Sequence, residues 1–278
     1  MVINSYSKIN LSLSVNSKSR NGLHEIQSFF CLINLSDKIK ISKINKKKDK
    51  ILFKGHFAKH IKKSDNSIVN LLKFLRKKKL ILNFYSISVI KNIPIFGGLG
   101  GGTSNAAFIL KYLLKEKINK NIFDKIVKLI GSDLRLFFYK QGFLESLKTI
   151  KAIKKKKKLI ILLSRPNINC STREIYSKVK KYSKKRKFFL HKISTKKKFI
   201  DYILNNKNQL QPIVEKKYPI IKKLLKVINN EKGCYLSRMS GSGSVCYGLF
   251  SNERTAKKAL NKIKSRYPKF WFSVAKTV

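Results

Sequence analysis

Residues 94–107 read Pro-Ile-Phe-Gly-Gly-Leu-Gly-Gly-Gly-Thr-Ser-Asn-Ala-Ala, and five of the chain's 13 glycines fall within residues 97–102. Before this stretch, Ile87 and Val89 alternate with serines and predict a strand, and helical spacing of apolar residues follows it. Glycine accepts positive φ and lets backbone amides approach an anion closely. A helix that begins near Thr103 adds unpaired amides and the positive end of its dipole at the same place. The order of strand, glycine cluster and helix therefore predicts a phosphate-binding loop.

Two common nucleotide-binding patterns do not fit this stretch. Gly97 and Gly102 have the spacing of the Walker motif, but Thr103 stands where that motif requires lysine. Gly98 and Gly100 begin the dinucleotide-binding pattern, and Thr103 again occupies the place of its last glycine. The motifs of protein kinases are also missing from the sequence. A merely flexible glycine turn is the alternative, and the flanking strand and helix argue against it.

The composition is strongly basic, since 64 lysines and arginines oppose 13 acidic residues and give a formal net charge of +51. Such a charge can indicate a nucleic-acid partner. The lysines, however, are spread along the whole chain beside isoleucine and asparagine, which is typical of a biased composition. A basic stripe with interleaved aromatic residues is not visible. We therefore expect no specific nucleic-acid partner, while a basic nucleic-acid-binding protein remains the alternative.

The rest of the composition favours a folded cytoplasmic protein. Hydrophobic residues make up 43% of the chain, which is enough for a core. The four cysteines are scattered without a Cys-x-x-Cys pair, so neither a disulfide framework nor a zinc site is predicted. The amino terminus lacks the apolar segment of a signal peptide, and no run approaches 18 apolar residues. We therefore expect a cytoplasmic location and no membrane partner.

Strand and helix patterns interleave along both halves of the chain without a regular βαβ repeat. Strands are predicted at residues 11–15, 39–41, 51–53, 87–89, 159–163, 245–250 and 270–274, and helices at residues 68–75, 106–114, 122–130, 172–205, 213–229 and 256–263. The lysine run at residues 154–158 is the predicted seam between residues 1–153 and residues 154–278. This interleaving predicts an α+β fold with two lobes.

Residues 94–107 resemble the Pro-x-x-x-Gly-Leu-Gly-Ser-Ser motif with which the GHMP kinases hold the phosphates of ATP. The extended glycine run resembles that of one family among them, the 4-diphosphocytidyl-2-C-methyl-D-erythritol kinases. Further stretches similar to that family follow one another in the same order, namely residues 7–11 with 20–28, 131–133, 208–212 and 237–243. The glycine loop, residues 94–102, is moderately specific alone, and the ordered set of similar stretches, the anchors, makes the resemblance strong.

The resemblance implies a two-lobed GHMP-kinase-like fold with the active site in the cleft between the lobes. An N-terminal ATP-binding domain would cover residues 1–153, and a C-terminal GHMP kinase domain would cover residues 154–278. The implied reaction is the ATP-dependent phosphorylation of the 2-hydroxyl of 4-(cytidine 5′-diphospho)-2-C-methyl-D-erythritol, a step of the non-mevalonate route to isoprenoid precursors. ATP and Mg²⁺ are the implied cofactors, the partner is a small-molecule substrate, and we expect a monomer or a weak homodimer.

Two alternatives stay open. The first is a GHMP kinase for another small alcohol, such as homoserine or mevalonate, and the Gly-x-His context of His24 argues against it. The second is a basic nucleic-acid-binding protein on a kinase-like fold, which should show a basic stripe with exposed aromatics.

Two charged residues are predicted to carry the chemistry. Asp133 lies between a predicted helix and an apolar stretch, and a carboxylate there can accept a proton from the attacking hydroxyl. The resemblance assigns it this role, and a helix cap is the alternative. The resemblance also places Lys8 beside Asp133, where an ammonium would keep the carboxylate ionised and neutralise developing charge.

The resemblance further implies two sets of binding residues. Those predicted for ATP are Pro94, Gly97, Gly98, Leu99, Gly100, Gly101, Gly102, Thr103, Ser104, Asn66 and Lys91. Those predicted for the substrate are Asn10, His24, Thr172, Gly241, Ser242 and Gly243. Within these sets, Asn66 and Lys91 are expected near the adenine and His24 at the cytosine. Ser104 is the predicted Mg²⁺ contact, with a helix N-cap as its alternative.

The sequence departs from the family pattern at several positions. Leu23 stands where the family has a tyrosine before the histidine, so a ring that could stack on the cytosine is missing there. Ser7 replaces an alanine, Arg135 replaces a proline, and Gln209 and Gln211 replace acids. We expect Leu23 to affect substrate affinity and the other four to change local geometry rather than the reaction.

Overall fold

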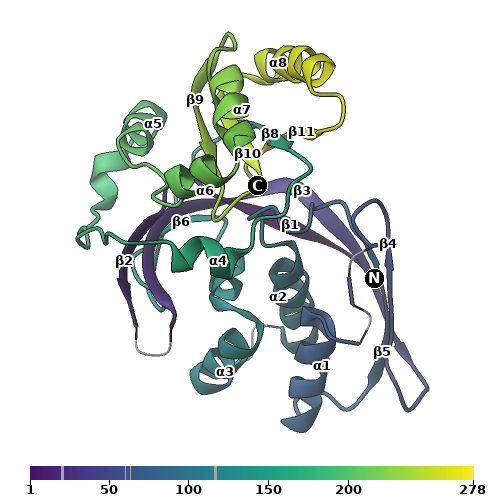
Figure 1. Cartoon of the computed structure of the whole chain (residues 1–278). Coiled ribbons are helices and arrows are strands. Elements are labelled where there is room, and N and C mark those ends of the chain that lie inside the picture. The colour runs from purple at the N-terminus through teal and green to yellow at the C-terminus, as the bar shows by residue number, and fades with distance from the viewer. Residues whose placement is uncertain (20–21, 60, 63, 116–117) are drawn as a thin grey trace. The chain divides into compact units, whose positions relative to one another are not determined.

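The computed structural model describes residues 1–19, 22–59, 61–62, 64–115 and 118–278 (Figure 1). Arg20 and Asn21, which belong to one of the anchors, lie outside the described residues. The strands are β1 (Val2–Asn10), β2 (Ser14–Lys18), β3 (His24–Ile44), β4 (Lys50–Lys54), β5 (Phe84–Ile90), β6 (Gln141–Leu144), β7 (Ile150–Ala152), β8 (Ile160–Arg165), β9 (Cys234–Met239), β10 (Cys246–Phe250) and β11 (Trp271–Lys276).

The helices are α1 (Ser67–Lys77), α2 (Gly101–Leu114), α3 (Lys120–Ile130), α4 (Thr172–Ser177), α5 (Lys196–Leu204), α6 (Gln211–Lys217), α7 (Pro219–Asn229) and α8 (Glu253–Arg266), with 3₁₀ turns η1 (Ser132–Phe138) and η2 (Leu190–Ile193). This mixture confirms the predicted α+β class. In the described part of the chain, the longest helices are too short or too polar to cross a membrane.

The chain forms two compact units, and each is assembled from segments that are distant in the sequence. The first unit comprises residues 1–8, 35–95 and 100–138. The second comprises residues 9–34, 96–99 and 139–278. The predicted boundary between residues 153 and 154 divides the sequence into two consecutive domains. The compact units are a different kind of division, because each contains several separate segments, so the predicted boundary stays a prediction.

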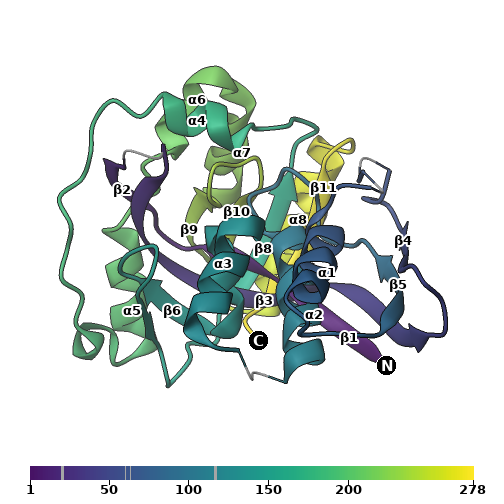
Figure 2. The ribbon, with the colours of Figure 1, turned by 90° about the horizontal axis from the view of Figure 1, so that it is seen from below.

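The first unit packs helices with strands of a seven-stranded sheet. The carboxyl-terminal part of β3 pairs antiparallel with β5, with Ile39 opposite Val89, and β4 pairs parallel with β5. Helices α1 and α2 lie side by side, and α1 also contacts α3 (Figure 2). Asn66 caps α1, as its side-chain oxygen accepts hydrogen bonds from the amides of Ile68 and Val69 at 3.1 Å each. The apolar spacing that predicts this helix becomes its buried face, formed by Ile68, Leu71, Leu72 and Leu75.

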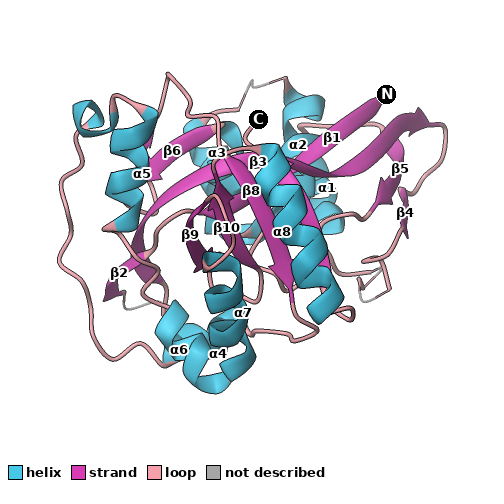
Figure 3. Ribbon diagram, turned by 90° about the horizontal axis from the view of Figure 1, so that it is seen from above, coloured by secondary structure: helices cyan, strands magenta, loops and turns pink. Residues whose placement is uncertain are grey.

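The second unit contains a four-stranded antiparallel sheet in the order β11-β8-β10-β9, of which β8, β10 and β9 are labelled in Figure 3. Helix α7 packs on β9 and β10, and α8 packs on β8 and β11. All five residues of β10 are buried. Elsewhere in this unit β3 pairs with β6, and Phe29 contacts a cluster of aromatic rings. The rings that Phe29 contacts belong to Phe143, Phe188, Phe199 and Tyr202.

Three expectations about secondary structure are wrong in detail. The helix predicted over residues 172–205 is interrupted, because residues 179–189 are irregular. Ser183 is hydrogen-bonded to β2 there, donating its amide to the carbonyl of Val15 at 2.8 Å. The helix predicted over residues 213–229 divides before Pro219, since proline disfavours helical backbone in the residue before it. Of the strand predicted at residues 11–15, only residues 14–15 belong to a strand, β2, because residues 11–13 lie between β1 and β2.

Candidate active site

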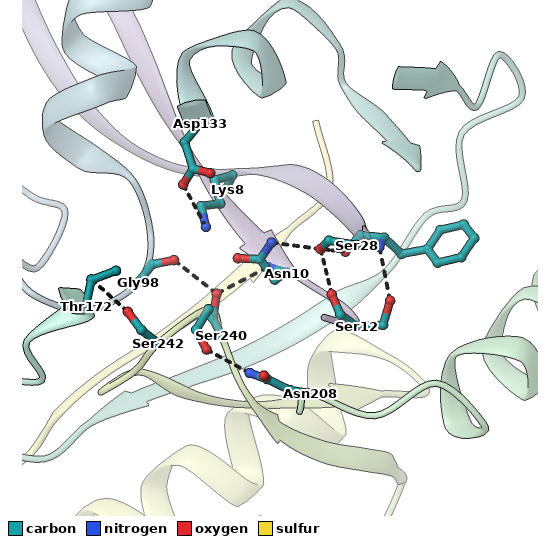
Figure 4. A network of polar contacts seen from close by, with 12 residues as sticks. Lys8, Asn10, Ser12, Ser28, Gly98, Asp133, Thr172, Asn208, Ser240 and Ser242 are labelled. Carbon is teal, nitrogen blue, oxygen red and sulfur yellow. Dashed lines mark hydrogen bonds and ion pairs between the residues drawn. The ribbon is translucent and has the colours of Figure 1, made fainter. Parts of the chain in front are cut away.

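In the first unit, the ammonium of Lys8 lies against the carboxylate of Asp133 (Figure 4). The Nζ of Lys8 is 3.1 Å from Oδ2 of Asp133, and the side chains are 4% and 33% exposed. The stem of Lys8 also meets the glycine loop, since a Cβ on Gly100 would lie 3.4 Å from Cε and Cγ of Lys8. A partly exposed carboxylate, a buried ammonium and the glycine loop therefore meet in one place, as predicted for Lys8 and Asp133.

The local sequence explains why Asp133 stays at the surface of this unit. Gly131 ends α3, and the following turn η1 buries Leu134, Leu136 and Phe137 while leaving Asp133 partly exposed. Arg135, which replaces the family's proline, forms a 2.5 Å ion pair with Asp124. The arginine at this position therefore pairs with Asp124, while the carboxylate of Asp133 pairs with Lys8.

The glycine loop has the backbone that its composition predicts. Gly98 and Gly100 have φ values of +71° and +69°, which L side chains rarely adopt. A Cβ on Gly98 would lie only 2.3 Å from the carbonyl oxygen of Ser240. Gly100 is the residue before α2 and has no side chain with which to cap it, so the first amides of α2 remain available to an anion.

Ser104 is fully buried and does not point outward from this loop. Its hydroxyl donates to the carbonyl of Tyr6 at 2.5 Å and shares a 2.6 Å hydrogen bond with the hydroxyl of Ser5. These contacts tie the first turn of α2 to β1. The helix-cap alternative for Ser104 is wrong, because Gly100 occupies the cap position.

The described residues do not fit a Mg²⁺ site of their own. Among them there is no group of three or more histidine, cysteine, aspartate or glutamate side chains that could hold a metal ion. The hydroxyl of Ser104 already donates and accepts a hydrogen bond, and the carboxylate of Asp133 pairs with Lys8. In phosphoryl-transfer enzymes generally, Mg²⁺ is bound by one or two carboxylates together with substrate phosphates and waters.

In the second unit, Asn10 and Ser240 join β1 to the glycine loop (Figure 4). The amide of Asn10 donates to the hydroxyl of Ser240 at 3.2 Å, and that hydroxyl donates to the carbonyl of Gly98 at 3.2 Å. The side chain of Asn10 donates to the hydroxyl of Ser28 at 2.8 Å. Ser28 and Ser240 were not predicted as site residues. Their positions inside the resembling stretches 20–28 and 237–243 were the signal that could have identified them.

Residues 241–243, which belong to the resembling stretch 237–243, are held by hydrogen bonds from two sides (Figure 4). The side-chain amide of Asn208 donates to the carbonyl of Gly241 at 2.8 Å. The hydroxyls of Thr172 and Ser242 share a 2.8 Å hydrogen bond. Thr172, Gly241, Ser242 and Gly243, all predicted for the substrate, are therefore brought together, and Asn208 is an additional residue that orders them.

His24 lies at the start of β3 beside two tyrosine rings. Its ring centroid is 5.0 Å from that of Tyr176 and 6.4 Å from that of Tyr182. Burial lowers the pKa of His24 below its ordinary value of 6.5, and the charge of Lys18 lowers the pKa further. Tyr176 follows Thr172 by one helical turn and could have been found by that spacing. Leu23 itself is 53% exposed.

Comparison with known proteins assigns the chain to a family. Residues 66–133 match the GHMP kinases N terminal domain, and residues 192–269 match the GHMP kinases C terminal model. The 4-diphosphocytidyl-2-C-methyl-D-erythritol kinase of Pelagibacter ubique (strain HTCC1062) is 39% identical over 287 aligned positions, which cover 99% of this chain and 98% of the relative. The kinase of the same name from Wolbachia pipientis wMel is 30% identical, with coverages of 95% and 94%.

A solved structure agrees with these sequence relationships. The crystal structure of a 4-(cytidine 5′-diphospho)-2C-methyl-D-erythritol kinase superposes with a TM-score of 0.75 and covers 99% of each chain at 19% identity. At that identity the superposition supports the fold, while the full-length sequence similarity supports the family. Together with the glycine loop and the Lys8–Asp133 pair, these relationships establish that the chain belongs to the 4-diphosphocytidyl-2-C-methyl-D-erythritol kinase family of the GHMP kinases.

Proposed function

We propose that this chain uses ATP to phosphorylate the 2-hydroxyl of 4-(cytidine 5′-diphospho)-2-C-methyl-D-erythritol, in the non-mevalonate route to isoprenoid precursors. The observation that carries the proposal is the contact of Lys8 with Asp133 at the glycine loop. The full-length similarity to kinases named for this substrate supports its identity.

In the proposed reaction, Asp133 accepts the proton of the substrate hydroxyl. The hydroxyl oxygen forms a bond to the γ-phosphorus of ATP as the bond from that phosphorus to the bridging oxygen breaks, and ADP leaves. The ammonium of Lys8, 3.1 Å from Oδ2 of Asp133, balances the carboxylate and the charge that develops during transfer. Phosphoryl transfer depends chiefly on positioning and charge stabilisation, which this arrangement can supply.

We propose that the phosphates of ATP bind at the backbone amides of residues 97–102 and the first turn of α2, with Pro94, Leu99 and Thr103 shaping the loop. Uncapped amides at the start of a helix are suited to an anion. Asn66 caps α1, and Ser67, the first residue of α1, lies near Gly102. We therefore place Asn66 close to the nucleotide. Mg²⁺ would arrive with the phosphates, and a direct contact with Ser104 would require its present hydrogen bonds to change.

The substrate is proposed to bind along the second unit's ordered polar groups. Asn10, Thr172 and residues 241–243 offer amides and hydroxyls to the diphosphate and the polyol. His24, whose ring lies 5.0 Å from that of Tyr176 at an interplanar angle of 37°, offers an aromatic surface with one ring-nitrogen donor and one acceptor to the cytosine. We also propose a cytoplasmic monomer or weak homodimer without a specific nucleic-acid partner.

The pH dependence of substrate affinity tests the role of His24. Because its pKa lies below 6.5, the imidazole stays neutral and keeps its acceptor nitrogen to a lower pH than a free histidine. We expect KM for the cytidylated substrate to be constant at neutral and alkaline pH and to rise as the pH falls through the lowered pKa. His24→Gln should abolish this rise, and His191→Gln should retain it. A rise that persists in His24→Gln would assign the titration to another group.

Turnover of three acceptors tests the function itself. The cytidylated substrate, homoserine and mevalonate are offered with ATP, and ADP release is measured. We expect turnover of the cytidylated substrate alone. Preferred turnover of homoserine or mevalonate would contradict the proposed substrate and would indicate a GHMP kinase of another specificity.

A further inference from the structure

Asp37 and Lys91 form a buried ion pair in the first unit. Their side chains are 0% and 2% exposed, and Nζ of Lys91 contacts Oδ2 of Asp37. The other carboxylate oxygen of Asp37 accepts hydrogen bonds from the amides of Asn92 at 2.8 Å and Ile93 at 2.9 Å. The desolvation of two charges can exceed their attraction, so a buried ion pair is weak evidence for a stabilising role. The position of this pair points to another role.

Lys91 lies beside the first turn of α2. A Cβ on Gly101 would lie 3.3 Å from Nζ of Lys91 and 3.0 Å from Cγ2 of Ile93. Gly101 is the first residue of α2, and the preceding Gly100 has no side chain to bond the amides of this turn. The ammonium is therefore adjacent to the amides that the proposed function assigns to phosphate.

Asp37 holds this ammonium in place by bonding to three consecutive residues, 91–93. Residues 91–93 directly precede Pro94, where the glycine loop begins, and Asp37 binds the side chain of the first and the amides of the next two. The backbone of Lys91 is also held, since its amide donates to the carbonyl of Lys54 at 2.7 Å. Lysine is otherwise a flexible point charge, and these contacts hold it in one place.

We propose that Lys91 supplies a fixed positive charge to the phosphate-binding end of α2, and that Asp37 is the positioning residue that holds it there. The inference rests on the proposed function, because it presupposes phosphate at the glycine loop. It assigns Lys91 to the phosphates instead of the adenine, and it gives a role to Asp37, which sequence motifs did not single out.

The test compares two variants whose charges differ. Lys91→Met removes the ammonium and leaves the Asp37 carboxylate bound to its two backbone amides, close to the phosphates. We expect Kd for ATP and KM for ATP to rise about tenfold, within the range of charge effects at helix ends, with a much smaller change in kcat. In the double variant Asp37→Asn with Lys91→Met both charges are absent, so both constants should lie between those of Lys91→Met and the wild type.

Arg76 and Asp49 provide the matched control in the same unit. They form an ion pair at 3.0 Å, and Asp49 also accepts a hydrogen bond from the amide of Tyr85. Arg76→Met, alone and combined with Asp49→Asn, should lower the midpoint of thermal unfolding without changing Kd for ATP. Thermal unfolding of all four variants separates loss of stability from loss of nucleotide affinity.

The inference is tested by the order of the ATP dissociation constants of the variants and the wild type. ATP affinity of Lys91→Met equal to that of the wild type would overturn it, and so would equal losses in Lys91→Met and the Arg76→Met control. Should Lys91→Met not fold because its buried carboxylate is unpaired, the double variant Asp37→Asn with Lys91→Met is compared with the double variant Asp49→Asn with Arg76→Met, and equal ATP affinities of these two would overturn the inference. Calorimetric Kd values for ATP need no acceptor substrate. A wild-type protein that binds ATP but does not turn over the cytidylated substrate would therefore contradict the proposed function while leaving this inference testable.

Discussion

Asparagine in place of Asp133 is expected to lower kcat by a factor of about 100 to 10,000, the usual contribution of a positioned general base. The amide cannot accept the hydroxyl proton, and it replaces the negative partner of the Lys8 ammonium, now 3.1 Å away, by a neutral group. ATP affinity should remain close to that of the wild type, since the glycine-loop backbone is unchanged. Single-turnover kinetics, together with calorimetry of ATP binding, separates these two quantities.

Asp124 supplies the control for that substitution. It also forms an ion pair in the first unit, with Arg135 at 2.5 Å, and is 34% exposed, close to the 33% of Asp133. Asp124→Asn should therefore change kcat by less than about threefold, in keeping with the small effect of exposed ion pairs. Wild-type turnover by Asp133→Asn would remove this carboxylate from the mechanism.

Alanine at Gly98 is expected to damage both the fold and ATP use. Its Cβ would lie 2.3 Å from the carbonyl oxygen of Ser240, and the backbone has a φ of +71°. Overpacking typically costs about 1 to 3 kcal/mol and left-handed backbone about 1 to 2 kcal/mol, so the free energy of unfolding should fall by about 2 to 5 kcal/mol. Because the loop must move to relieve the contact, kcat/KM for ATP should fall at least about tenfold, a loss of about 1.4 kcal/mol in transition-state binding.

Gly22→Ala separates the cost of the left-handed backbone from the cost of the steric clash with Ser240. Gly22 has a similar φ of +80°, but a Cβ there would meet nothing within 4 Å. Its unfolding free energy should fall by only about 1 to 2 kcal/mol, with ATP kinetics unchanged. Denaturant unfolding and steady-state kinetics provide the measurements. Equal effects of the two substitutions would show that the contact with Ser240 does not control the loop.

Local patterns in the sequence predict those elements whose causes are local. The buried face of α1 and its cap at Asn66 follow from apolar spacing and one asparagine side chain. The irregular segment 179–189 could not be predicted in this way, because its position depends on a hydrogen bond from Ser183 to Val15, far away in the sequence. The irregularity is decided by tertiary contacts, which a window of neighbouring residues does not contain.

The candidate site divides along the same line. Lys8, Asp133 and the glycine loop carry recognisable motifs, and the structure brings them into contact as expected. In the sequence Asp37 simply precedes a lysine, which is unremarkable in a chain so rich in lysine. Only the fold reveals that its carboxylate is buried against Lys91. The environment of Ser104 is likewise set by β1, on which Ser5 and Tyr6 lie.

The discontinuity of the two compact units constrains how the protein can form during synthesis. The chain passes from one unit to the other at residues 8–9, 34–35, 95–96, 99–100 and 138–139. The first unit can therefore be completed once residue 138 has left the ribosome. The second unit is still incomplete at that point. In it, Leu32 accepts a hydrogen bond from the amide of Val278, and Ile33 forms a β-bridge with Thr277. The segment at residues 9–34, which carries His24, therefore lacks these partners until residues 277–278 have been synthesised, so the proposed substrate-binding residues assemble later than the first unit.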